Sequence, residues 1–199
     1  MKKKVFIVTL IILGILFLFF CVFKFLSLGN NKIIGDVNDL DKFILSIENY
    51  NACANISVYS NKNSNTYRLN QSCRGGITTQ EIDDGKSKIV IICDGGNKLT
   101  IKNTVLPTEK VFEVYSEACN NSIGLDAFIE DYNADCNSEI KEENGYFVVS
   151  VKAKNSQNRY SKSKVLYFNK EKRRIEKIVV KDINNNDVII IEYSTLEIL

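Results

Sequence analysis

The strongest constraint on the fold of this chain is its many short alternating runs, each separated from the next by turn-forming residues. Within such a run, apolar and polar side chains alternate from one residue to the next, which is typical of a strand with one buried face. The stretch from Ile56 to Gln71 shows this twice, on either side of the turn formers Asn61 to Asn65. We predict about eleven strands, near residues 52–60, 66–74, 77–82, 88–93, 98–102, 111–114, 138–143, 146–153, 160–169, 174–182 and 187–195.

Only two segments have the period of an amphipathic helix. After a cap at Asp36 or Asn38, apolar residues recur at helical spacing, and we predict a helix over Val37 to Asn49. A second helix follows Ser122, with an apolar face made of Leu125, Phe128, Ile129 and Tyr132. A mostly antiparallel sheet of this size must curl and have one face covered. The predicted fold class is therefore α+β, a curved half-barrel sheet covered by two helices.

The N-terminal segment predicts a membrane anchor. Three lysines precede an uncharged apolar run from Val5 to Phe23, long enough to cross a bilayer, which needs about 20 residues. The alternative is a signal peptide cleaved near Ser27 to Gly29. Bulky Phe19 and Phe20 before Cys21 do not form a lipobox. We divide the chain into a cytoplasmic tip and transmembrane anchor (1–28), a linker (29–35) and an extracytoplasmic domain (36–199), which predicts a single-pass protein of the cell membrane.

Five cysteines follow the apolar run, so at least one is unpaired within a monomer. They are Cys53, Cys73, Cys93, Cys119 and Cys136. No two have the C-x-x-C spacing of a redox pair or a zinc ribbon. Matching the apolar faces of the first hairpin pairs Ile56 with Leu69, which sends Cys53 and Cys73 to opposite faces of the sheet. The sequence leaves the disulfide pairing open.

The composition argues against an enzyme. The chain contains no His, so Ser-His-Asp and Cys-His catalysis and His-ligated zinc are excluded. No Gly-rich phosphate loop follows a strand and opens a helix, and no cofactor is expected. Asp126 and Glu130 lie four residues apart on the second helix, where we expect a solvated polar face. A net charge of +2 does not predict nucleic-acid binding.

One stretch resembles a calcium loop. Asp131, Asn133, Asp135 and Glu142 occupy ligand positions one, three, five and twelve of an EF-hand. The sixth position needs Gly for its sharp turn and holds Cys136 instead. No helix can follow, since Asn144-Gly145 is a hairpin signal. These four residues are the only metal candidates that we weigh, and we expect no metal site.

The last predicted strand is the candidate for self-association. Residues 188–193 are long and apolar, and an exposed edge of this kind permits strand exchange between two copies. Val188, Ile190 and Tyr193 are the residues that we expect at such a homodimer contact.

Four stretches resemble the GerS-related family of clostridial germination lipoproteins, which shares the fold of the lipoprotein carriers LolA and LppX. They are Ser60 to Tyr67, Gly124 to Tyr132, Ser163 to Lys170 and Ile191 to Ile198. The resemblance implies a LolA-like half-open sheet closed by helices. It also implies a non-enzymatic accessory role in sporulation and germination, in which the protein binds a CwlD-like cell-wall amidase during modification of the spore cortex and resides in the forespore or spore envelope. The alternative function is that of a carrier or sensor of lipid or lipoprotein in an apolar cavity.

Overall fold

The computed structural model describes residues 34–60, 63–94, 98–103, 108–113, 123–154 and 159–199, with the backbone alone for 108–113. Residues 36–199 form one compact unit. The predicted anchor, residues 1–28, lies outside the described part of the chain. Within that part no helix has the length and apolar character needed to cross a membrane.

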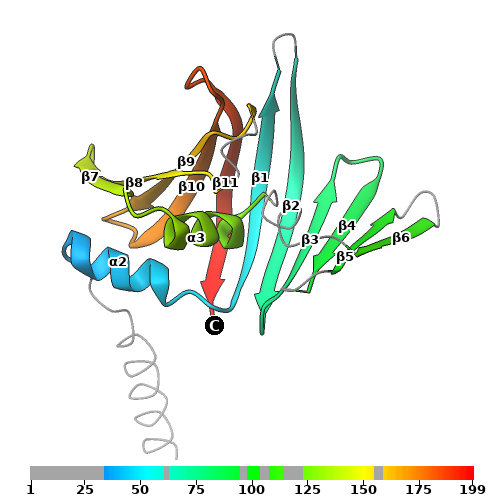
Figure 1. The fold of residues 1–199 in the computed structure, drawn as a ribbon, viewed down its shortest axis with the longest axis horizontal. Coiled ribbons are helices and arrows are strands. Elements are labelled where there is room, and N and C mark those ends of the chain that lie inside the picture. The colour runs from blue at the N-terminus through cyan, green and yellow to red at the C-terminus, as the bar shows by residue number, and fades with distance from the viewer. Residues whose placement is uncertain (1–33, 61–62, 95–97, 104–107, 114–122, 155–158) are drawn as a thin grey trace, which may run out of the picture. The chain divides into compact units, whose positions relative to one another are not determined.

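The unit is built on one open antiparallel sheet of eleven strands, ordered β6-β5-β4-β3-β2-β1-β11-β10-β9-β8-β7 (Figure 1). The strands are β1 (Tyr50–Tyr59), β2 (Ser64–Arg74), β3 (Ile77–Asp83), β4 (Lys88–Cys93), β5 (Lys98–Asn103), β6 (Thr108–Glu113), β7 (Glu139–Glu143), β8 (Tyr146–Lys152), β9 (Ser163–Asn169), β10 (Arg174–Lys181) and β11 (Asp187–Ile198). This confirms the predicted antiparallel α+β architecture. The Asn144-Gly145 hairpin is also confirmed, because both residues have the positive φ that its tight turn requires.

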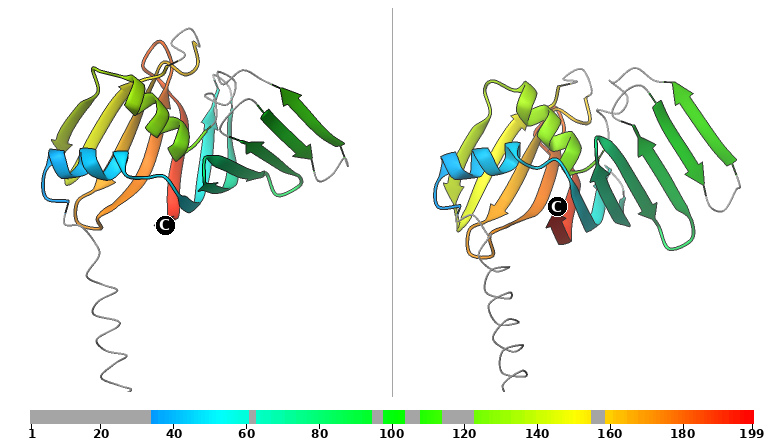
Figure 2. Two further views of the ribbon diagram at one scale, coloured as in Figure 1. Left: turned by 60° about the horizontal axis from the view of Figure 1, so that its bottom comes forward. Right: turned by 90° about the horizontal axis from the view of Figure 1, so that it is seen from below.

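Two helices, α2 (Val37–Leu45) and α3 (Leu125–Ala134), lie over the same face of the sheet (Figures 1 and 2). We call this the helix face and the opposite side the outer face. The helices cover the half formed by β1 and β7 to β11, while β3 to β6 extend beyond them. Helix α2 ends four residues before the predicted Asn49, because Ser46 closes it by donating to the Phe43 carbonyl and the chain then turns toward β1.

The core is a row of aliphatic side chains in register across five strands of the helix face. Ile56, Ile191, Ile178, Leu166 and Val149 are directly paired from β1 to β8, and each is at most 1% exposed. Above this row, Phe128 of α3 and Leu40 and Ile44 of α2 are fully buried. Each such side chain contributes about 1.5–3 kcal/mol by leaving water, so this row and its helical cover dominate stability.

The first hairpin is tighter than predicted. Ser60 donates its backbone N–H to the Asn63 carbonyl, so Ile56 pairs with Tyr67 and not with Leu69. The shift of two residues keeps every side chain on its predicted face. Cys53 is exposed and Cys73 buried, on opposite faces as predicted. Cys53, Cys73 and Cys136 are free thiols, and Cys119 lies outside the described residues.

The prediction that the last strand is an edge is wrong. Strand β11 lies inside the sheet and pairs with β1 on one side and β10 on the other, while β6 and β7 form the two edges. Tyr193 is buried, and Val188 and Ile190 are half-buried within a paired strand. The apolar character of β11 thus reflects its central position in the sheet, and exchange of this strand would require breaking both ladders.

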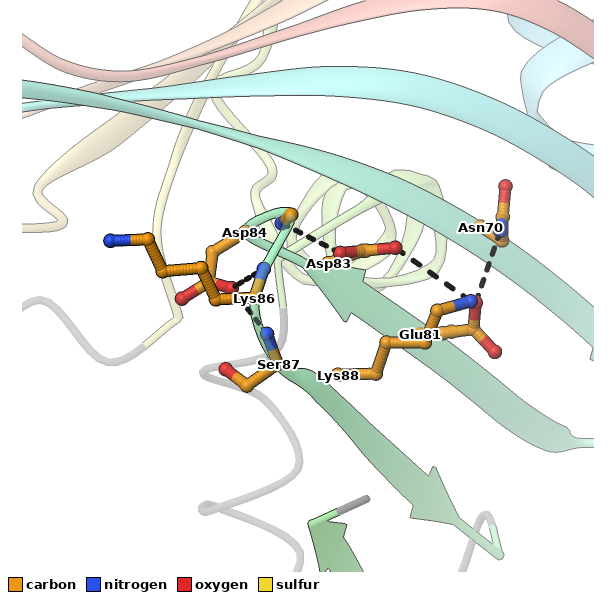
Figure 3. Close-up of polar contacts among 8 residues, drawn as sticks. Asn70, Glu81, Asp83, Asp84, Lys86, Ser87 and Lys88 are labelled. Atoms are coloured by element: carbon orange, nitrogen blue, oxygen red, sulfur yellow. Dashed lines mark hydrogen bonds and ion pairs between the residues drawn. The ribbon is translucent and has the colours of Figure 1, made fainter. Parts of the chain in front are cut away.

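Polar side chains hold β2, β3 and β4 together on the outer face (Figure 3). The Lys88 ammonium pairs with Glu81 at 2.8 Å and lies 3.7 Å from Asp83, while Asn70 donates to Glu81. In the turn, Asp84 accepts backbone N–H bonds from Lys86 and Ser87, which lowers the pKa of its carboxyl group. These carboxylates are already paired, so this cluster is a register-fixing network of the sheet.

A buried ion pair fixes α3 to the sheet. Lys164 of β9 points at α3, and its ammonium lies 2.8 Å from Asp131 and donates to the Ala127 carbonyl at 3.0 Å. Both side chains are at most 6% exposed. Asp131 also accepts the backbone N–H of Lys154. Both charges are thus compensated by partners inside the protein.

We expect Lys164→Ala to destabilise the protein by about 3–5 kcal/mol, because it leaves the Asp131 carboxylate buried without its counter-charge. The matched control is Lys154→Ala, which removes a 3.1 Å ion pair to Glu130 with both side chains more than 40% exposed. That change costs about 0.2–1 kcal/mol. Urea unfolding of the full chain measures both. Equal losses for the two variants would contradict the assigned role of Lys164.

A second ion pair predicts an acid-sensitive contact on the outer face. Glu176 of β10 accepts from Lys172 at 2.8 Å and from the Tyr146 hydroxyl at 2.7 Å. These bonds, Lys172 first, lower the pKa of its carboxyl group from 4.5 to about 2. The ionised group stabilises the native state above pH 4.5, and this contribution is lost as the pH falls through about 2.

Glu176→Gln should therefore destabilise the protein most above pH 5, and the difference from wild type should shrink toward pH 2. Urea midpoints at several pH values measure this difference. Glu171→Gln, at an exposed position of the preceding turn, controls for general loss of a carboxylate. A difference between wild type and Glu176→Gln that stays constant from pH 7 to pH 2 would contradict the assignment.

Candidate functional site

The helix face carries a buried polar cluster where α3 begins. Asp126, in the first turn of α3, accepts from Gln71 of β2 at 2.7 Å and from the Tyr50 hydroxyl of β1 at 3.3 Å. The Tyr50 hydroxyl in turn accepts the backbone N–H of Asp126 at 3.1 Å. Gln80 of β3 donates to the Ile123 carbonyl at 2.6 Å, just before the helix. Three strands thus bind the start of one helix.

Burial and the Asp126 carboxylate keep the two tyrosines of the cluster protonated. The pKa values of Tyr50 and Tyr193 are both raised far above the ordinary value, first by burial and then by the negative charge of Asp126. Burial also raises the pKa of the neighbouring Cys73 thiol. Each of the three groups is therefore neutral at physiological pH, and the Tyr50 hydroxyl donates to the Asp126 carboxylate. Neutral phenol and thiol groups are not activated nucleophiles.

Sequence reasoning missed this cluster. We expected Asp126 on a solvated helix face with Glu130, and only Glu130 fits, since it forms the exposed ion pair with Lys154. The first-turn position of Asp126 is a sequence signal for an acid that stabilises a helix N-terminus. Its partners Tyr50 and Gln71 could not be found in the same way, because they come from strands 76 and 55 residues away.

Beside the cluster lies an aliphatic surface on the helix face of β3, β4 and β5. It consists of Ile82, Ile89, Ile91, Leu99 and Ile101, which register places on the same face as Gln71 and Gln80. Ile89 is 38% exposed and the other four are half-buried. Neither described helix lies over these strands (Figure 2). The apolar surface on this half is therefore within reach of a ligand or a partner.

The calcium candidates do not assemble into a site. Asp131 and Asn133 lie within α3, where Asp131 is held by Lys164. Asp135 accepts backbone N–H bonds from Asn137 and Lys152, and Glu142 pairs with Lys170. A calcium loop needs these positions in a tight turn, which the helix prevents. Over the described ranges, no group of three or more His, Cys, Asp or Glu side chains is placed to hold a metal ion.

Comparison with solved structures finds partial likenesses. A chain in the structure of the CwlD amidase from Clostridioides difficile in complex with the GerS lipoprotein is 21% identical, with 79% of this chain and 90% of that chain covered and a TM-score of 0.47. An uncharacterised conserved protein from Thermus thermophilus is 7% identical, covering 80% and 88%, with a TM-score of 0.48. A LolA superfamily protein from Nitrosomonas europaea is 9% identical, covering 79% and 93%, with a TM-score of 0.42.

These identities lie below 25% and these TM-scores below 0.5, so the likeness assigns neither a family nor an activity to this chain. No protein-family model matches the sequence. No curated protein matches it either.

The contacts at the start of α3 predict that a side chain at position 124, now Gly124, destabilises the protein. Its φ of +146° and ψ of −171° belong to a region that only glycine adopts readily, and a Cβ there would collide with the Gln71 amide. Gly124→Ala should cost about 1–3 kcal/mol from the backbone alone, and the collision adds to this. Gly85→Ala is the control, since its φ is +83° but a Cβ there meets nothing within 4 Å.

Thermal or urea unfolding of both variants measures the difference. We expect Gly124→Ala to lose clearly more stability than Gly85→Ala, whose cost is about 1–2 kcal/mol from left-handed backbone strain. Equal losses would mean that the contact between Gly124 and Gln71 does not constrain the entry into α3.

Proposed function

We propose that this chain is a non-enzymatic, membrane-anchored extracytoplasmic accessory protein that binds a cell-wall amidase during modification of the spore cortex and is needed for germination. The observation that supports the proposal is that aromatic side chains fill the space between the two helices and the sheet. Phe128, Phe147 and Phe168 are fully buried between the helices and the sheet. Phe43 of α2 packs edge-on against Phe168 at 5.7 Å, so aromatic side chains occupy the space between helix and sheet that a carrier would reserve for acyl chains.

The nature of the partner rests on the sequence resemblance to the GerS-related family. Two of its stretches, Gly124 to Tyr132 and Ser163 to Lys170, fall on α3 and β9, which the buried pair of Asp131 and Lys164 joins. The stretches that carry the resemblance thus include the contact that fixes α3 to the sheet. A rigid surface loses little conformational entropy on binding, which suits an accessory protein.

The test is crosslinking of the full-length protein in sporulating cells, followed by affinity recovery and mass spectrometry. We expect a cell-wall amidase to be recovered, and the purified protein alone to show no amidase turnover. A deletion strain should form spores with altered cortex and impaired germination. Recovery of no amidase, together with normal cortex and germination in the deletion strain, would overturn the proposal.

A lipid or lipoprotein carrier is the second candidate, favoured by the aliphatic surface on β3 to β5. A lipid held there would contact Ile91, whereas Ile92 on the same strand faces outward. Native mass spectrometry of the full-length protein would then show bound lipid in wild type and in Ile92→Asp, but not in Ile91→Asp. Absence of lipid from wild type would remove this candidate.

A further inference from the structure

Strands β10 and β11 separate at one end of the sheet. Their ladder ends at the pair of Lys177 and Glu192, yet β11 continues to Ile198 on β1, and β10 begins at Arg174 on β9. Two bulges lie at this level, because Glu176 has no counterpart in β9 and Ser194 has none in β1. A bulge bends its strand and raises the local twist, so two neighbouring bulges turn the strands apart.

A cleft of about 280 Å³ lies at this divergence. It is lined by Tyr146, Arg174, Glu176, Lys177, Glu192 and Tyr193. Pockets for drug-sized ligands begin at about 300 Å³, so the cleft suits a ligand of one or two amino-acid residues. It belongs to β8, β10 and β11, all within the described residues, and it lies apart from the aliphatic surface on β3 to β5.

Two of the charged groups in the cleft already have contacts within the protein. Glu176 holds the Tyr146 hydroxyl and the Lys172 ammonium. The Lys177 ammonium stacks over the Tyr167 ring at 4.3 Å from its centre. These contacts fix the walls of the cleft, and they leave the recognition of a ligand to the remaining groups.

The remaining charged groups are one cation and one anion. The Arg174 guanidinium lies 3.8 Å from Glu176, a long ion pair, and its side chain is 44% exposed, so its paired N–H donors are available. The Glu192 side chain is exposed, and its carboxylate forms no hydrogen bond or ion pair with any described residue. Arginine binds carboxylates through two parallel N–H bonds, and a carboxylate binds an ammonium group. Opposite charges at one cleft favour a zwitterion over a simple anion or cation.

The backbone of β11 adds a third element of recognition. From Tyr193 onward this strand pairs with β1 alone among the described strands. The N–H and C=O groups on its other side therefore have no ladder partner, as at a sheet edge. An extended peptide can bind such groups by adding its own main chain to the strand.

We propose that this cleft binds a short peptide with both ends free, whose carboxylate is held by Arg174, whose ammonium is held by Glu192, and whose main chain pairs with β11 from Tyr193 onward. The requirement for both ends distinguishes a free short peptide from the C-terminal tail of a protein, which presents a carboxylate without a nearby ammonium.

The probe is the dipeptide Ala-Glu, titrated into the isotope-labelled full-length chain in detergent micelles and followed by NMR. We expect shifts in the amide signals of Glu192 and Tyr193, at least tenfold weaker binding in Arg174→Gln, and at least tenfold weaker binding of acetyl-Ala-Glu to wild type. Glu192→Gln should bind the two peptides equally. Arg68→Gln, which removes an exposed arginine on β2, is the matched control and should bind Ala-Glu as wild type does.

Dispersed spectra of each variant establish that it is folded. Failure of Ala-Glu to shift the signals of wild type, equal affinity of wild type for the acetylated peptide, or unchanged binding in Arg174→Gln would each overturn the proposal. Equal weakening in Arg68→Gln and Arg174→Gln would also overturn it, because the attraction would then reflect general charge.

Discussion

The structure depends on one row of aliphatic side chains that runs straight across five strands. Ile56, Ile191, Ile178, Leu166 and Val149 share a face and a level, although they come from parts of the chain up to 135 residues apart. A row of this kind fixes the register of every strand in it, because a slip of one residue would send an isoleucine to the outer face. The row gives the two helices a fully buried apolar surface to pack on, and they cover β1 and β7 to β11 and leave β3 to β5 uncovered (Figure 1).

Apolar contacts hold α3 against the sheet but do not fix its position along the strands. Polar contacts fix that position. Asp126 is bound by side chains of β1 and β2, and Asp131, five residues further on, is bound by Lys164 of β9. Because these strands lie on opposite sides of β11 and β10, the two carboxylates fix the helix across the central part of the sheet. Both carboxylates are buried or half-buried. A shift of the helix would leave these charges without partners inside the protein, which is unfavourable. The two carboxylates thus specify one position of α3 on the sheet.

Periodicity predicted the elements of this fold well, because strand alternation and helical spacing are local properties. The eleven strands, both helices and the Asn144-Gly145 hairpin were all found near the predicted positions. The predictions that failed depend on contacts between residues far apart in the sequence. The edge role of Val188, Ile190 and Tyr193 was wrong, since an apolar strand has the same sequence whether it lies at an edge or between two partners. The calcium pattern of Asp131, Asn133, Asp135 and Glu142, from which we expected no metal site, is a match of spacing alone, because the helix and Lys164 decide what Asp131 contacts. Asp126 was missed because its partners are distant in sequence.

The sheet that forms the core also contains the polar cleft between β10 and β11. Eleven strands with the usual twist cannot stay flat, and the strain of curvature is released where strands bulge. Here Glu176 and Ser194 bulge side by side, and the ladder between β10 and β11 opens below the pair of Lys177 and Glu192. The opening occurs on the outer face, so it does not disturb the aliphatic row one residue away at Ile178 and Ile191. Arg174 and Glu192 lie at this opening and not in the apolar core, so their charges do not destabilise the core. A ligand can therefore bind at the opening independently of the function of the helix face.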